Sequence, residues 1–180
     1  MNGWDYSTPG FYFITICTYN HNNFFGKIIN GKMELSDRGQ IAVDELIKTI
    51  SIRKSLIINP WVVMPNHVHL LITIRDIPVE THCHASLHES SPTPIFIHSH
   101  RNHPDFYQDI NSKSIQTISQ TIKSFKGAVK RICKKHNIYF AWQPRFYDEI
   151  IHDEKRLTQI KYYIRNNPKN WQKDRLFSKL

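Results

Sequence analysis

Two apolar segments joined by only two residues constrain the fold of this chain more than any other feature. They span 56–64 and 67–74, and Pro65 and Asn66 connect them. So short a connection makes them antiparallel neighbours in one sheet. Because side chains alternate along a strand, the second segment has one continuous apolar face that suits a core. That face consists of Val68, Leu70, Ile72 and Ile74.

The opposite face of this segment carries two histidines, His67 and His69. Since they are two residues apart on a strand, both imidazoles point the same way. Such a pair can converge on one divalent cation. The alternative is two partly exposed histidines on a sheet surface. Two ligands alone rarely hold a metal, so a third must come from another element.

The N-terminal part predicts a strand, a hairpin and a helix. Aromatic and β-branched residues favour a strand at 11–18, and an Asn-Gly pair favours a hairpin at 28–33. Ser36 or Asp37 can then cap a helix that runs to about residue 52.

The C-terminal part predicts two helices around a last strand. Apolar residues recur every three or four positions from about 114 to 136, as on a helix with one buried face. A strand is expected within 139–151. Asp153 can cap a final helix that ends near Asn167, because Pro168 disfavours helical geometry in the residue before it.

This order predicts an α+β fold of ferredoxin-like (RRM-like) type: an antiparallel sheet with helices on one face and an added C-terminal helix. A length of 180 residues fits one domain, 1–180. The stretch 78–112 lacks periodicity and is expected to be an irregular insertion. It holds six of the eleven histidines, but their spacing matches no tight metal site.

The charge balance points to a polyanionic partner. Twenty-four Lys and Arg against fifteen Asp and Glu give a formal net charge of +9, which favours nucleic acid. The sequence contains no run of about 18 apolar residues, so no membrane-spanning helix is expected. The start of the chain lacks a signal-peptide pattern, and three scattered cysteines argue against a disulfide framework. A cytoplasmic location is therefore expected.

The final helix can bring a phenol and a carboxamide to the histidine face. At 100° per residue, Arg156, Gln159, Tyr163 and Asn167 share one face, and Tyr162 points to solvent. The first set meets the histidines if the helix lies across the sheet. The alternative is that Tyr163 only packs at the edge of the core.

Four segments occur in an informative order: 10–18 (GFYFITICT), 62–69 (VVMPNHVH), 142–148 (WQPRFYD) and 163–168 (YIRNNP). Together they closely resemble the REP-associated tyrosine transposases, single-tyrosine transposases of the HUH endonuclease superfamily. The resemblance covers nearly the whole chain apart from 78–112. At positions 149 and 152 the chain has Glu and His, where the family often has His and Arg.

The resemblance implies a role for each residue of the predicted site. His67, His69 and Asn167 would hold a divalent metal ion, Mg²⁺ or Mn²⁺. Tyr163 would attack single-stranded or hairpin DNA of a palindromic repeat, forming a 5′-phosphotyrosine and releasing a 3′-hydroxyl. Relatives of this kind act as monomers or as dimers that exchange the tyrosine helix, and both states remain open.

Two further groups of residues are candidates for DNA binding. Cations of the long helix could track the phosphate backbone, or could form only a solvated face; they are Lys123, Lys126, Lys130 and Arg131. A second group could stack on bases or bind a hairpin, or could only pack in the core; it is Trp142, Arg145, Phe146 and Tyr147.

Two other functions compete with a transposase. One is a module that binds single-stranded nucleic acid without cutting it. The other is a metal-dependent hydrolase in which water cuts the DNA and Tyr163 only positions it. Mutating Tyr163 separates the three possibilities.

Overall fold

The computed structural model describes residues 8–53, 55–74 and 117–177. The predicted insertion at 78–112 lies outside the described residues and stays a prediction, as does the single domain spanning the whole chain. Of the helices in the described ranges, none combines the length and the apolar character that a membrane span requires.

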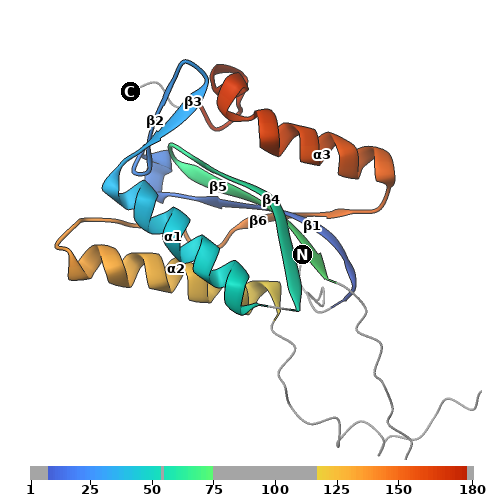
Figure 1. Cartoon of the computed structure of the whole chain (residues 1–180), viewed down its shortest axis with the longest axis horizontal. Coiled ribbons are helices and arrows are strands. Elements are labelled where there is room, and N and C mark those ends of the chain that lie inside the picture. Colours follow the sequence, from blue (N-terminus) through green and yellow to red (C-terminus); the bar gives the residue numbers. More distant parts are fainter. Residues whose placement is uncertain (1–7, 54, 75–116, 178–180) are drawn as a thin grey trace, which may run out of the picture. The chain divides into compact units, whose positions relative to one another are not determined.

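A four-stranded antiparallel sheet lies at the centre of these residues (Figure 1). In spatial order its strands are β4 (Leu56–Met64), β5 (His67–Ile74), β1 (Gly10–Cys17) and β6 (Tyr147–Ile151). Helix α1 (Asp37–Ile52) connects β1 to β4, and α2 (Ile118–Lys135) precedes β6. This is the βαββαβ order of a ferredoxin-like domain, and the predicted fold class is confirmed.

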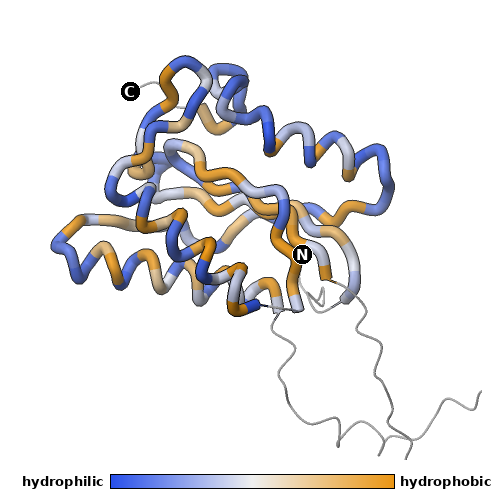
Figure 2. Tube along the Cα trace, viewed as in Figure 1, coloured by the Kyte–Doolittle hydropathy of each residue, from blue (hydrophilic) through white to orange (hydrophobic). Residues whose placement is uncertain are grey.

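The sheet is covered on both faces (Figure 1). Helices α1 and α2 lie on one face, where the main core includes Val68, Leu70 and Ile72 of β5. Helix α3 (Glu154–Asn166) lies on the other face, over a smaller core that includes Leu71 and Ile164. Figure 2 shows that hydrophobic residues are concentrated in the strands between these layers. The predicted alternation of β5 is therefore confirmed, with a core on each side.

Local signals explain where most elements begin and end. The Ser36 side chain accepts a hydrogen bond from the Gly39 N–H, and the Asp153 side chain accepts one from Arg156, which caps α1 and α3 as predicted. Thr117 caps α2 in a reciprocal capping box. Helix α3 ends at Asn166, close to the predicted end.

The described residues also contain a two-stranded hairpin and two 3-10 segments. Strands β2 (Gly26–Ile29) and β3 (Lys32–Leu35) form a separate hairpin. Its turn residues Asn30 and Gly31 have φ of 51° and 72°, as an Asn-Gly turn favours. After α3 the chain continues as a 3-10 segment, η3 (Pro168–Lys173). A second 3-10 segment, η1 (Tyr19–His21), follows β1.

Alanine substitutions at two helical glycines, Gly39 and Gly127, are expected to change the stability of the protein in opposite directions. A Cβ at Gly39 would overlap the carbonyl oxygen of Phe25, whereas a Cβ at Gly127 would meet no atom within 4 Å. Gly127→Ala should therefore raise the free energy of unfolding by about 0.5–1 kcal/mol. Gly39→Ala should lower it by about 1–3 kcal/mol, because the backbone must shift. Urea unfolding of both variants tests this, and equal effects would contradict it.

Candidate active site

Two buried histidines form the centre of the candidate site. The His67 and His69 side chains are 0% and 1% exposed, and their ring centroids are 4.3 Å apart. The His67 Nδ1 lies 2.8 Å from Asn66 Oδ1, and the His69 Nδ1 lies 2.9 Å from Thr15 Oγ1. These contacts fix the rings through Nδ1, as second-shell partners do for metal-binding histidines. Two partly exposed surface histidines are therefore excluded.

Burial keeps both rings neutral. It lowers the pKa of His67 to about 3, with a smaller contribution from the nearby His21 and Arg175. Burial also lowers the pKa of His69 well below its usual value, and His67 adds to this. Neutral imidazole is the form that binds metal ions, so both histidines are ready ligands at neutral pH.

This burial predicts a pH dependence of stability. Below pH 6.5 the unfolded chain protonates His67 and the folded protein does not, so acid favours unfolding. The stabilisation is complete above about pH 6.5 and is lost progressively toward pH 3, by up to about 1.4 kcal/mol per pH unit. Urea unfolding with EDTA at pH 7, 6 and 5 measures this slope. His67→Gln should reduce the slope, and an unchanged slope would contradict the prediction.

Helix α3 brings Tyr163 to the histidines. The phenol oxygen lies 3.3 Å from His69 Nε2 and donates a hydrogen bond of 2.6 Å to Asp174 Oδ2. Its ring meets Phe13 edge-on, with centroids 6.0 Å apart. Burial, and then the hydrogen bond to Asp174, raise the pKa of Tyr163. Tyr162 is 67% exposed, so the helix periodicity chose the tyrosine that faces the histidines.

Asn167 and Asp174 complete the cluster. The Asn167 side chain is 2% exposed, and its Nδ2 donates a 2.6 Å hydrogen bond to Asp174 Oδ2. Ligand atoms of His67, His69 and Asp174 all lie within 4.8 Å of one another. Asp174 was not among the residues predicted from the sequence, although it is the one acidic residue between 169 and 180.

Two buried atoms of the cluster lack hydrogen-bond partners among the described residues. They are His67 Nε2 and Asn167 Oδ1. A buried polar atom without a partner is unfavourable and calls for an explanation such as an ion. With the adjacent carboxylate of Asp174, this gives a mixed nitrogen and oxygen donor set of the kind that divalent cations bind.

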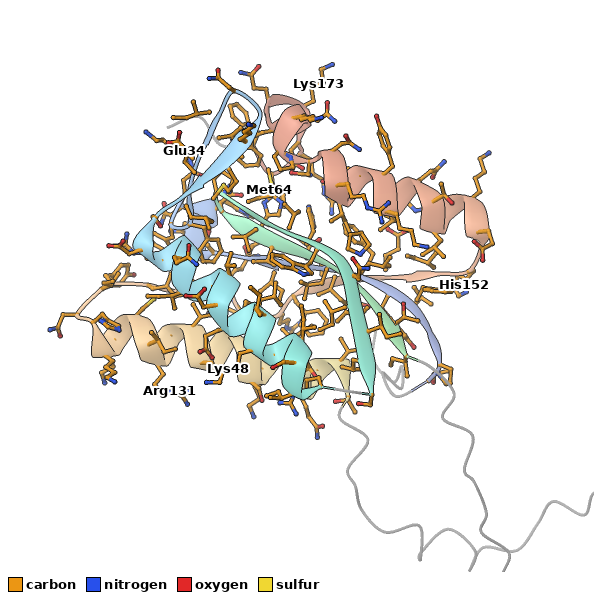
Figure 3. The ribbon with its side chains drawn as sticks, viewed as in Figure 1. Glu34, Lys48, Met64, Arg131, His152 and Lys173 are labelled. Atoms are coloured by element: carbon orange, nitrogen blue, oxygen red, sulfur yellow. The ribbon has the colours of Figure 1, made fainter. Side chains whose placement is uncertain are left out.

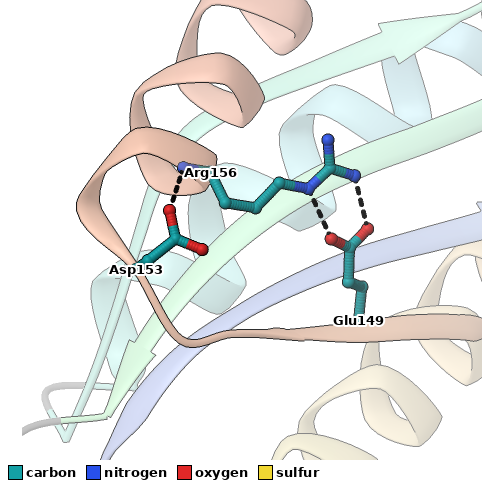
Figure 4. Close-up of polar contacts among 3 residues, drawn as sticks. All are labelled: Glu149, Asp153 and Arg156. Atoms are coloured by element: carbon teal, nitrogen blue, oxygen red, sulfur yellow. Dashed lines mark hydrogen bonds and ion pairs between the residues drawn. The ribbon is translucent and has the colours of Figure 1, made fainter.

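A cavity of about 420 Å³ opens beside Tyr163 and His69. Its wall contains three exposed cations, which are Arg156, Lys173 and Arg175. Gln159 also lines it, so three of the four residues predicted to share one face of the helix line this cavity, and the fourth, Asn167, does not. Arg156 donates two hydrogen bonds to Glu149, at 2.6 and 2.8 Å, while its backbone N–H binds Asp153 (Figure 4). Glu149 therefore orients this cation on the cavity wall.

The cations predicted to bind DNA on α2 lie on the face of the sheet away from α3 (Figure 1). Lys123, Lys130 and Arg131 are exposed there. Lys126 differs, because its ammonium donates hydrogen bonds to the carbonyls of Gln143 and Arg145. DNA binding by these residues stays a prediction.

The aromatic group around 142–147 has mixed surroundings. Trp142 donates its Nε1 hydrogen to the carbonyl of Lys126. Both Trp142 and Phe146 pack against the main core. Arg145 is exposed with φ of 62°, and Tyr147 is 51% exposed at the edge strand. Arg145 and Tyr147 are therefore the members best exposed to a ligand, and their role stays a prediction.

Comparison with known proteins gives the fold and a relative. No family model matches the chain. A solved structure of a REP-associated tyrosine transposase bound to a REP hairpin superposes with a TM-score of 0.56 and 18% identity. The match covers 95% of this chain and 74% of that one, and at this identity it shows a shared fold. A protein of Haemophilus influenzae, named only as an uncharacterized protein, is 33% identical over 179 residues, covering 98% of this chain and 90% of that protein. The chain therefore belongs to the same family as the Haemophilus influenzae protein, and it has the fold of the tyrosine transposase.

Proposed function

We propose that this protein is a transposase-like single-stranded DNA endonuclease and strand transferase with Tyr163 as its nucleophile. One observation carries the proposal. The Tyr163 hydroxyl lies in contact with His69 and Asp174, at the wall of a cavity lined by three cations. A candidate nucleophile, a candidate metal cluster and candidate phosphate-binding cations therefore line one cavity, which supports the proposal.

A divalent metal ion would be held by His67 and His69 through Nε2 and by the carboxylate of Asp174. The Oδ1 of Asn167, which has no hydrogen-bond partner within the described part of the chain, would be a further oxygen donor. Two imidazoles favour Mn²⁺ in affinity, while the oxygen donors also suit Mg²⁺. Such an ion would polarise the scissile phosphate and offset its negative charge.

The residues of the chain perform the transfer itself. Tyr163 is protonated at neutral pH, and Asp174 Oδ2 already accepts its hydrogen bond and so is positioned to take the proton. The phenol oxygen attacks phosphorus and forms a 5′-phosphotyrosine. The bond to the 3′-oxygen breaks, and that oxygen leaves with the electron pair and takes a proton from solvent. Arg156, Lys173 and Arg175 hold neighbouring phosphates.

A phosphotyrosine intermediate explains how one site both cuts and joins. The new bond is still a phosphate ester, so another 3′-hydroxyl can attack it and restore a DNA strand. A water nucleophile would only cut. Since one tyrosine cuts one strand, the substrate is single-stranded or hairpin DNA.

The test follows both ends of a hairpin oligonucleotide taken from beside the gene. With Mn²⁺ or Mg²⁺, the 3′ label should migrate with the protein on a denaturing gel, and the 5′ label should appear on a shorter fragment. EDTA should remove both bands. Cleavage without a protein-linked band would instead mean a hydrolase, and binding without cleavage would mean a binding module.

A further inference from the structure

A groove of about 520 Å³ lies between α1 and α2, on the face of the sheet away from α3. This volume is within the range of about 300–1,000 Å³ that ligand pockets occupy. Its charged lining consists of four cations and one acid, which are Lys48, Arg53, Lys123, Arg131 and Glu45. Figure 3 labels Lys48 and Arg131 on this side of the sheet, and Lys173 of the candidate active site on the other. The groove is therefore separate from the cavity beside Tyr163.

The four cations form one pair at each end of the groove. Helices α1 and α2 run antiparallel (Figure 1), and a hydrogen bond joins the start of α1 to the segment just beyond α2. Arg53 therefore lies at the same end as Lys123, and Lys48 lies at the same end as Arg131. Lys123 and Arg131 are eight residues apart on α2, which is about 12 Å at 1.5 Å per residue.

The end of the groove at Arg53 has the groups that bind phosphate. The Nε of Arg53 is buried and has no hydrogen-bond partner among the residues that the structure describes. Neither Arg53 nor Lys123 forms an ion pair with any described acidic residue. Ser124 adds a hydroxyl beside them. Because a buried donor without an acceptor is unfavourable, an anion at this end would stabilise the arginine.

The opposite end of the groove has a different character. Glu45 is 8% exposed there, and its carboxylate lies 3.7 Å from the Lys48 ammonium. A carboxylate repels phosphate, but it accepts hydrogen bonds from the exocyclic amine of a nucleobase. The guanidinium of Arg131 offers a plane on which a base can stack. This end therefore suits a base better than a phosphate.

The middle of the groove is uncharged and open. Gly127 and Ala128 line it on α2, and a Cβ at Gly127 would meet no atom within 4 Å. Ile52 of α1 lines the groove with a side chain that is 61% exposed. Each strand of a DNA duplex carries a phosphate about every 3.4 Å of helix axis, so a polynucleotide would place phosphates over these apolar residues. A single nucleotide, with phosphates at one end only, fits the lining better.

We propose that this groove binds a free nucleoside triphosphate, with its phosphates at Arg53 and Lys123 and its base toward Glu45. The inference does not depend on the proposed function, because the residues described here as lining the groove share no member with the cavity beside Tyr163. A nucleotide in the groove leaves that cavity open to DNA.

The test is isothermal titration calorimetry with the full chain in EDTA, so that no divalent ion can hold a nucleotide at the histidines. ATP should bind at least about tenfold more tightly than tripolyphosphate, which lacks a base, or adenosine, which lacks phosphates. ATP should also bind more tightly than UTP, because uracil has no exocyclic amine to donate to Glu45.

Variants of the lining locate the binding site. Arg53→Gln and Lys123→Gln should each weaken ATP binding at least about tenfold, since each removes a charged contact to phosphate. Gly127→Leu should abolish binding, because its side chain fills the groove, and leucine favours the helix. Lys130→Gln is the matched control, since Lys130 is an exposed lysine of α2 that does not line the groove. It should bind ATP like the wild type.

Thermal unfolding without nucleotide checks that each variant is folded. Equal affinity for ATP, UTP and tripolyphosphate, or equal losses in Lys123→Gln and Lys130→Gln, would mean an unselective basic surface and overturn the proposal. A fluorescent single-stranded oligonucleotide tests DNA as the occupant. If Gly127→Leu weakens binding of the oligonucleotide and ATP does not bind the wild type, the groove holds DNA and the proposal is wrong.

Discussion

Tyr163→Phe is expected to abolish the protein–DNA adduct and metal-dependent cleavage, while Tyr162→Phe leaves both unchanged. The two tyrosines are adjacent on α3, and each variant removes only the phenol oxygen of its own residue. Only the Tyr163 oxygen contacts His69 and Asp174, and the Tyr162 side chain is 67% exposed. Phenylalanine has no nucleophilic atom, so the loss should be on the order of a thousandfold or more.

The assay is the denaturing gel with end-labelled hairpin DNA, run beside a measurement of DNA affinity. Tyr163→Phe should keep its affinity for DNA, since it leaves the cations of the cavity in place. Continued cleavage without an adduct would assign the reaction to water and make Tyr163 a positioning residue. Equal loss in Tyr162→Phe would show that the helix itself had been disturbed.

The sequence predicted the parts of the site that lie on regular elements. Alternation along β5 was enough to put His67 and His69 on one face, and the 3.6-residue period of α3 was enough to choose Tyr163 over Tyr162. Both inferences need only local geometry. The apolar stripe of α3 showed that the helix is buried along one side, but a stripe does not say which face of which sheet it covers.

Asp174 could not be predicted in the same way. It follows Pro168–Lys173, a 3-10 segment with an irregular residue at Asn170, so no period relates its side chain to α3. The chain turns back after the helix, and only that turn brings the carboxylate to Tyr163 and Asn167. Asp174 stands between two basic residues in the sequence, but its charge alone does not show which part of the fold its side chain contacts.

For the cations of α2, too, the sequence predicts which side chains are exposed but not where the helix lies in the fold. Periodicity correctly separated the buried stripe of Phe125 and Val129 from the exposed lysines. It could not show that α2 covers the face of the sheet opposite α3. Lys126 was counted with a phosphate-binding surface, yet it binds two backbone carbonyls near Trp142. Which charges lie beside a site depends on the packing of layers, which local sequence does not encode.

Loss of metal binding is the other large effect that we expect. Mn²⁺ at a hundred times its dissociation constant should stabilise the wild-type protein by about 2.7 kcal/mol. His67→Ala should abolish this stabilisation, because it removes a buried ligand atom that has no hydrogen-bond partner among the described residues. His136→Ala, at an exposed histidine at the end of α2, should keep it. Chemical unfolding with Mn²⁺ or with EDTA measures the difference.

Variants of Asp174 and Asn167 test which of the two residues is the third metal ligand. Asp174→Asn keeps the shape of the side chain but removes the negative charge nearest the two histidines, so Mn²⁺ affinity should fall at least about tenfold. Asn167→Ala removes a neutral oxygen and should weaken binding less. If Asn167→Ala abolishes binding and Asp174→Asn does not, the carboxamide is the third ligand, and Asp174 serves only to hold Tyr163. If His67→Ala still gains stability from Mn²⁺, the ion binds elsewhere and the proposed metal cluster is wrong.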